Sequence, residues 1–207
     1  MPPPTTDSPH VATRSPSGRI VEIAKENMTA EQLAAYHKVV SGPRGRLPTP
    51  YKIWLHSPKL AHAMDDIGTY LAQASSLTKR EAEIAVLAIA RHFDADYVFQ
   101  VHARAAQDAG LSRGVIRAIA DKTAPPLTDP REQAVFRVTA ALCDAPHVAD
   151  EVFDEADKIL RQNGIADVLA LLGYFASVAF VAKFYAVPPP SAPNNRTRQI
   201  EDASAVP

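Results

Sequence analysis

Two ionisable residues interrupt an otherwise apolar stretch of the chain, and their side chains are suited to acid/base chemistry. Glu83 directly precedes the apolar run Ile84–Ala90, and His102 lies within an apolar stripe further along. Imidazole and carboxylate are common general acids and bases in enzymes. If Glu83 and His102 meet, they form a unit that can move a proton. We predict that they make one hydrogen-bonded pair lining a mostly apolar pocket.

The elements that must position this pair are two helices within residues 77–111. A capping box at Thr78–Glu81 predicts the start of the first helix, and its apolar run is typical of a helix buried on all sides. The chain turns near residue 93, and the second helix is predicted over about Ala95–Gly110, with the glycine as C-cap. In an antiparallel hairpin, Glu83 and His102 lie almost equally far from the turn, so their heights along the two axes agree.

A purely structural interpretation of the pair stays open at this point. A histidine on an apolar stripe is often only a hydrogen-bonded core residue. Glu83 can equally be a first-turn carboxylate that the helix dipole stabilises. A water-accessible cavity at Glu83 and His102 would favour an enzyme, whereas a dry, filled core would favour a scaffold.

Composition excludes several functional classes. The 207 residues provide one ordinary core, and 22 Lys plus Arg against 23 Asp plus Glu leave no basic excess for nucleic acid. Cys143 is the only cysteine, so neither an intrachain disulfide nor a Cys-x-x-Cys pair is possible. The most apolar segment, Val168–Ala182, is shorter than the ~20 residues of a membrane span, and the N-terminus lacks the pattern of a signal peptide. We therefore expect a cytoplasmic protein with no membrane or nucleic-acid partner.

Periodicity and capping signals predict an all-α fold with a single domain over residues 20–187. Proline-rich segments at 1–19 and 188–207 are predicted to be flexible arms that can lie along neighbouring subunits. Capped helices are expected at Thr29–Ser41, from Ser57–Pro58, from Ser112, from Asp129, over 150–162 and from Asp167. No strand pattern, glycine-rich phosphate loop or zinc-type histidine spacing occurs, so we expect a bundle of seven or eight helices without a metal.

Short motifs distributed from about residue 41 to 190 resemble those of the carboxymuconolactone decarboxylase and alkylhydroperoxidase-D (AhpD-like) superfamily. Their order and spacing carry the resemblance. The motifs are Gly42-Pro43-Arg44-Gly45, Trp54-Leu55-His56-Ser57-Pro58, Arg80-Glu81-x-Glu83, Arg91-His92-x-Asp94-Ala95-x-Tyr97, His102, Ala109-Gly110-Leu111-Ser112, Gly173-Tyr174 and Val187-Pro188-x-Pro190.

The resemblance implies an AhpD-like helical bundle around a central antiparallel helix pair, assembled as a dimer, trimer or trimer of dimers and working without a cofactor. Glu83 and His102 occupy the places of the family's Glu and His. The two thiols of the peroxidase branch fall on Ala95 and Val98, and the decarboxylase-like branch often carries Glu at position 98. The chain therefore resembles a decarboxylase-like branch that lacks the Cys-x-x-Cys motif.

The resemblance also points to substrate-binding residues. They are Arg44, His56, Tyr97, Val98, Tyr174 and Lys183. Arg44 could hold a carboxylate with its planar fork, and Lys183, where relatives often carry Asn, could add a cation at the pocket mouth. The alternatives are a solvated arginine in a turn, a packing role for His56 and a snorkelling lysine at a helix end.

Three functions follow, in order of preference. The first is a cofactor-free lyase or isomerase acting on a small organic acid or lactone, with His102 as proton donor and Glu83 orienting it; the family context is the catabolism of aromatic compounds. The second is a non-catalytic oligomeric scaffold or binding protein. The third is a thiol peroxidase, which a lone Cys143 on another helix does not support.

Overall fold

The computed structural model describes residues 18–190, so the predicted arms at 1–19 and 188–207 lie almost wholly outside the described residues. Within the described part the fold is all-α, as predicted, with eight α-helices, one short 3₁₀ helix at Lys25–Asn27 and no strand. The helices are α1 (Ala30–Ser41), α2 (Thr49–Trp54), α3 (Pro58–Gln73), α4 (Lys79–His92), α5 (Asp96–Asp108), α6 (Arg113–Ala120), α7 (Pro130–Asp144) and α8 (Asp150–Phe184).

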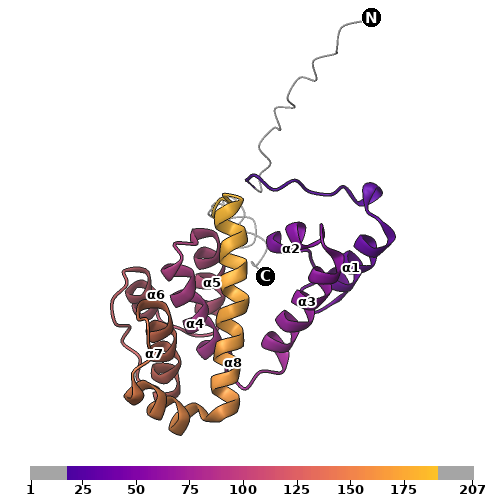
Figure 1. Ribbon diagram of the computed structural model, residues 1–207. Coiled ribbons are helices and arrows are strands. Elements are labelled where there is room, and N and C mark those ends of the chain that lie inside the picture. The colour runs from indigo at the N-terminus through magenta and orange to yellow at the C-terminus, as the bar shows by residue number, and fades with distance from the viewer. Residues whose placement is uncertain (1–17, 191–207) are drawn as a thin grey trace, which may run out of the picture.

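The helices form two groups on either side of α8. Figure 1 shows α8, in orange to yellow, running along the molecule with α4–α7 packed on one side and α1–α3 on the other. The α1–α3 group contacts the remaining helices mainly through α8. Residues that line a site between the groups must therefore come from both ends of the sequence.

Helix α4 is the centre of the larger group. Thr78 and Glu81 form the predicted capping box. Almost the whole run Ile84–Ala90 is buried, as expected for a helix that is apolar all round. One face of α4 packs in the main core with α7 and α8, and the other packs with α5 and α6 in a second apolar cluster. The predicted antiparallel pair is α4 and α5, and Gly110 ends it with the expected positive φ of 86°.

Helix α3 begins at Pro58 as predicted, but its buried face differs in part from the apolar periodicity, which predicts a stripe through Leu60, Met64, Ile67 and Leu71. Leu60 and Ile67 are 45% and 43% exposed. The buried residues are Ala61, Asp65, Gly68 and Leu71, of which only Leu71 belongs to the expected stripe. A buried ion pair and a close backbone approach determine this face, and neither produces an apolar periodicity.

The C-terminal region consists of two helical segments that meet at a kink within α8. The break expected at Asn163–Gly164, between a helix over 150–162 and one from Asp167, lies slightly earlier, at Arg161, whose φ of 63° and ψ of 172° are not helical. Gly164 continues the helix, and a Cβ there would lie 3.1 Å from the Leu160 Cβ, so its lack of a side chain allows close packing. By length and composition α8 could also cross a membrane, a property it shares with core helices of soluble proteins.

Candidate active site

The structure brings the two predicted acid/base residues together. His102 Nδ1 lies 2.8 Å from Glu83 Oε2, across the α4–α5 pair. Glu83 is 8% exposed, and the His102 side chain retains 21% of its accessible surface. The imidazole also stands edge-on to Phe175 of α8, with ring centroids 4.8 Å apart. Because Nδ1 is used by Glu83, Nε2 is the nitrogen left for a ligand.

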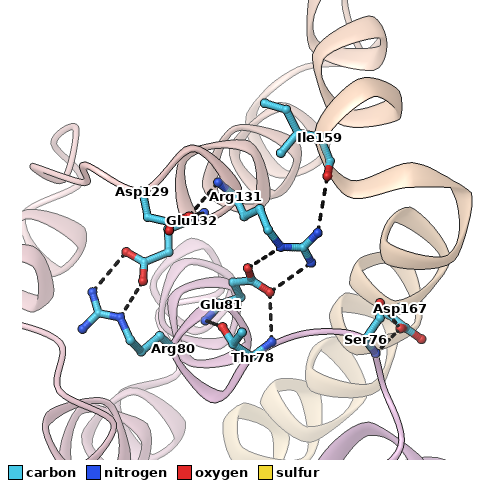
Figure 2. A network of polar contacts seen from close by, with 9 residues as sticks. All are labelled: Ser76, Thr78, Arg80, Glu81, Asp129, Arg131, Glu132, Ile159 and Asp167. Carbon is cyan, nitrogen blue, oxygen red and sulfur yellow. Dashed lines mark hydrogen bonds and ion pairs between the residues drawn. The ribbon is translucent and has the colours of Figure 1, made fainter.

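A network of charged residues fixes the N-terminus of α4, two residues before Glu83. Glu81 accepts from the Thr78 backbone N–H at 2.9 Å and from Arg131 of α7 at 2.8 Å. Arg80 donates to Glu132 at 2.5 Å, so two arginine–glutamate pairs join the starts of α4 and α7 (Figure 2). These carboxylates are almost fully buried. Bidentate pairs of this kind hold their partners in a defined geometry, so the start of the helix that carries Glu83 is fixed.

Glu83 and His102 line a cavity of about 500 Å³ between the two helix groups. Its wall is mostly aliphatic and aromatic, with polar groups at a few points. The lining residues are Arg44, Arg46, Pro48, Pro50, Tyr51, Gly68, Leu71, Ala72, Leu77, Lys79, Ala82, Glu83, Val86, Tyr97, Val98, Val101, His102, Leu171, Tyr174, Phe175 and Val178. A volume of ~300–1,000 Å³ with few polar groups is typical of small-molecule sites.

Four of the predicted substrate-binding residues are on this wall. Arg44 lies 2.7 Å from Asp65 and stacks over the Tyr51 ring. Tyr97 donates to the Thr49 hydroxyl at 2.9 Å. The other two are Val98, which is buried, and Tyr174 of α8.

The remaining two, His56 and Lys183, are not on the cavity wall, and the expectation that they face the pocket is wrong. His56 is exposed in the turn between α2 and α3, and its Nε2 lies 3.0 Å from the carbonyl oxygen of Val21. Lys183 is exposed in the last turn of α8, beyond the positions that face the cavity. A cation there complements the helix dipole.

Three residues on or beside the wall are absent from the predicted set. Asp65 is 5% exposed and holds Arg44, and Tyr51 is 1% exposed. Gly68 leaves the space that Arg44 and Tyr174 occupy. The sequence signal for Asp65 is that Gly68 follows it three residues later in the same helix, which puts both on one face. This signal becomes informative only when the buried face of α3 is known.

The lone thiol is remote from this cavity. Cys143 of α7 lines a separate cavity of about 310 Å³ with His92 and Asp144. Burial raises the pKa of the Cys143 thiol to about 11. Ala95, at one of the two thiol positions implied by the resemblance, is buried at the start of α5. Among residues 18–190 no group of three or more His, Cys, Asp or Glu is arranged to hold a metal ion.

Comparison with known proteins matches the central part of the chain to one family. Residues 58–141, which contain Glu83 and His102, match the model of the carboxymuconolactone decarboxylase family. Over these residues the chain is similar to the carboxymuconolactone decarboxylase family, which agrees with the resemblance of its sequence motifs. No curated protein matches it by sequence.

Solved structures share the AhpD-like fold at low sequence identity. An uncharacterized peroxidase-related protein from Ralstonia eutropha JMP134, described as an alkylhydroperoxidase AhpD core, has a TM-score of 0.68 and 17% identity, covering 86% of this chain and 94% of its own. An uncharacterized peroxidase-related protein from Silicibacter sp. TM1040 has a TM-score of 0.68 and 14% identity, and the match covers 87% of this chain and 96% of that protein. The debrominase Bmp8 has a TM-score of 0.64 and 12% identity, and the match covers 87% of this chain and 97% of the debrominase. At these identities the similarity establishes the fold alone.

Proposed function

We propose that this protein is a cofactor-free enzyme that uses Glu83 and His102 for acid/base chemistry on a small organic acid or lactone. The observation that carries the proposal is the 2.8 Å contact of the two side chains on the wall of a cavity of about 500 Å³. A scaffold that had lost its chemistry has no need to keep both a hydrogen-bonded carboxyl–imidazole pair and a cavity beside it.

The chemistry follows from the hydrogen bond that each group makes. With Glu83 holding Nδ1–H, the neutral ring presents an Nε2 lone pair that can accept a proton from a substrate carbon. The protonated ring can return that proton from Nε2. Glu83 then orients the imidazole and stabilises its cationic form. Decarboxylation and double-bond isomerisation both need a proton at carbon after electron density has moved onto a neighbouring carbonyl, and this pair can supply it.

We propose a small ring compound as the substrate for this cavity of about 500 Å³. Val98, at the position where the decarboxylase-like branch often has Glu, makes the wall beside His102 apolar. His102 and Glu83 would therefore act without a second carboxylate. In the debrominase, the same fold holds 2,3,4-tribromopyrrole in a C82A variant, which supports a small ring as the ligand here. Tyr97 and Tyr174 are proposed to contact it.

Thiol peroxidase chemistry is not proposed, although several proteins of this fold are described as peroxidase-related. That reaction needs a reactive thiolate with a resolving thiol. The positions where the resemblance places them hold Ala95 and Val98. Cys143 lies on another cavity with its pKa raised to about 11.

We also infer a homo-oligomer, which remains a proposal. Leu169, Phe180 and Phe184 of α8 are 47%, 54% and 74% exposed. Apolar surface of this kind on a helix is typical of a protein contact. Light scattering at micromolar concentration should give a dimer or larger species; a monomer would contradict the inference.

The catalytic proposal is tested by a ligand screen followed by a proton-exchange assay. Small aromatic and lactone acids are first ranked by the thermal stabilisation that they give the wild-type protein. Hits are then followed by NMR in D₂O for deuterium incorporation at carbon, loss of carboxylate, or isomerisation. We expect turnover that falls at least about a hundredfold in His102→Ala and Glu83→Gln.

His56→Ala is the matched control, because His56 is an exposed histidine outside the cavity. It should keep wild-type turnover. Ligands that stabilise the protein but undergo no exchange or conversion would contradict the enzyme and favour the binding protein. Turnover that survives His102→Ala would place the chemistry elsewhere.

A further inference from the structure

A second polar group lies on the cavity wall and comes from other elements than the acid/base pair. Arg44 precedes α2, Tyr51 lies on α2 and Asp65 on α3, and Tyr174 comes from α8. Tyr51 Oη and Tyr174 Oη are 3.2 Å apart. Phe175 makes edge contacts with both His102 and Tyr174, at centroid distances of 4.8 and 5.3 Å. One aromatic ring therefore separates the imidazole from the phenol along the wall.

We propose that Tyr174 is the hydrogen-bond donor to a substrate carbonyl oxygen as that oxygen becomes negatively charged, and that Gly68 and the Arg44–Asp65 ion pair position it. This inference rests on the proposed acid/base function and adds the group that stabilises the negative charge on the substrate oxygen. It also specifies the substrate: an uncharged carbonyl, of a ketone or lactone, next to the carbon that exchanges its proton.

The charge of Arg44 is already compensated, which argues against a carboxylate at this point of the wall. Its Nη1 lies 2.7 Å from Asp65, a carboxylate that is only 5% exposed. A substrate carboxylate would have to displace that buried partner. The other two cations of the wall, Arg46 and Lys79, are solvent-exposed, so a substrate carboxylate is better placed beside them at the mouth.

The two phenols suit an oxygen that gains charge during the reaction. Burial raises the pKa of both Tyr51 and Tyr174, so each keeps its proton at neutral pH. Tyr51 can donate either to the carbonyl of Met64 at 3.3 Å or to Tyr174 at 3.2 Å. Both distances are long for O–H···O bonds, so the proton positions can exchange. With Tyr51 donating to Tyr174, the Tyr174 proton is available to the substrate, and such a chain strengthens the final bond.

Gly68 explains how Arg44 and Tyr174 come together. A Cβ at this position would lie 2.7 Å from Tyr174 Oη and nearer still to Arg44 Nη2. Any side chain at residue 68 would therefore displace both groups. A glycine inside a helix costs about 1 kcal/mol relative to alanine, and the clearance gives a reason for its presence in α3.

The reaction step balances without an oxidant or a reductant. His102 Nε2 takes a proton from the carbon next to the carbonyl. The C–H electron pair forms the new C=C bond, and the carbonyl π pair moves onto oxygen. Tyr174 donates its hydrogen bond to this enolate. A proton, which in D₂O can first exchange with solvent, then returns from His102 Nε2 to a carbon of the enolate. The C=C electron pair forms the new C–H bond, a pair on oxygen restores the carbonyl, and the isomer is released. Donors placed at a developing oxyanion stabilise the transition state more than the ground state.

The test uses 4-nitrophenol as an enolate mimic and 4-nitroanisole as its uncharged analogue. Binding of each is measured by calorimetry, and the absorbance of the bound nitrophenol reports whether it is ionised. Wild-type protein should prefer the phenolate. Tyr174→Phe should weaken phenolate binding at least about tenfold and change nitroanisole binding little, because only the hydrogen bond to a charged oxygen is lost. Gly68→Ala should also weaken phenolate binding at least about tenfold, because it displaces Tyr174 together with Arg44.

Controls separate this inference from the acid/base proposal. Tyr185→Phe, outside the cavity, should bind both probes as the wild type does. His102→Ala should keep the preference for the phenolate even though it abolishes turnover. The inference is overturned if Tyr174→Phe keeps the preference, if it weakens both probes equally, if His102→Ala alone removes the preference, or if wild-type protein shows none. Should Gly68→Ala fail to fold, Tyr174→Phe decides the question by itself.

Discussion

Replacing His102 with alanine tests how strongly the acid/base pair is coupled in the folded protein. In the wild type, Glu83 is 8% exposed and its Oε2 lies 2.8 Å from His102 Nδ1. Removing the imidazole leaves a buried carboxyl group without that partner. An unsatisfied buried polar group costs about 1–3 kcal/mol, and we expect a loss in that range. The partial exposure of the His102 side chain lets water replace some of the lost bond, which argues against the larger ~3–5 kcal/mol seen for fully buried ion pairs.

A double-mutant cycle isolates the pairwise contribution. Glu83→Gln keeps an oxygen that can accept from Nδ1–H, so this variant alone should lose less than about 1 kcal/mol. With glutamine at position 83, His102→Ala leaves a neutral amide rather than a carboxyl group unpaired. We therefore expect His102→Ala to be less destabilising in the Glu83→Gln background than in the wild type, by ~0.5–3 kcal/mol.

The free energy of unfolding is measured at neutral pH by urea denaturation, followed by far-UV circular dichroism. The dependence on urea concentration should have the same slope in all four proteins, because a change in slope would indicate a changed denatured state. His56→Ala provides a histidine replacement outside the site. If the single changes add within about 0.3–0.5 kcal/mol, the pair is not energetically coupled, and the reasoning that places it as one unit is refuted.

Three further predictions concern residues outside the acid/base pair. Burial by itself would raise the pKa of Asp167, but hydrogen bonds from Ser76 and Tyr70 lower it below its ordinary value. The ionised Asp167 therefore stabilises the fold at pH values above the pKa of the unfolded state, and this stabilisation is lost as the pH falls through the lower pKa of the folded state. In Asp167→Asn, the free energy of unfolding should depend less on pH below about pH 4 than in the wild type. Arg131→Ala should lower stability by ~1–3 kcal/mol, because Glu81 is 2% exposed and loses that partner, and urea denaturation measures this loss. Alkylation of Cys143 at neutral pH should be slower than that of a free thiol, and Cys143→Ser should keep turnover, because its thiolate is disfavoured and lies in another cavity.

The features that could be predicted from the sequence are those determined by nearby residues. Helix α4 begins where the Thr78–Glu81 capping box indicates, and Gly110 ends the second helix of the pair. The pairing of Glu83 with His102 follows from their nearly equal distance from one turn, because antiparallel helices with a short connection keep their register. The position of Glu83 relative to His102 is therefore determined by the residues of one helix hairpin.

The other half of the site could not be predicted because its determinants are tertiary. The buried face of α3 carries Asp65 and Gly68. Because neither residue is strongly apolar, hydrophobic periodicity assigns both to the solvent-exposed face. They are buried because Arg44 from a preceding loop and Tyr174 from α8 meet there. Neither the ion pair nor the missing Cβ produces an apolar pattern in the sequence. The predicted stripe therefore began one residue too early, at Leu60 instead of Ala61.

The position of the kink in α8 also depends on tertiary packing. Pattern rules treat a glycine after polar residues as a helix end, yet Gly164 serves close packing and the chain deviates at Arg161. Asp167, predicted as a cap, instead accepts from the Ser76 backbone N–H at 2.6 Å (Figure 2). It also accepts from the Tyr70 hydroxyl at 2.7 Å. These bonds join α8 to the end of α3.

The two halves of the site therefore depend on different parts of the molecule. Glu83 and His102 belong to the α4–α5 pair, which the arginine–glutamate network fixes at the start of α4 (Figure 2). Arg44 and Gly68 belong to the α1–α3 group, which reaches the remaining helices mainly through α8 and the bonds of Asp167. A change that loosens this junction should move the tyrosine side of the cavity relative to the imidazole while leaving the acid/base pair intact. Substrate binding and orientation would then suffer before the ability of the pair to exchange a proton.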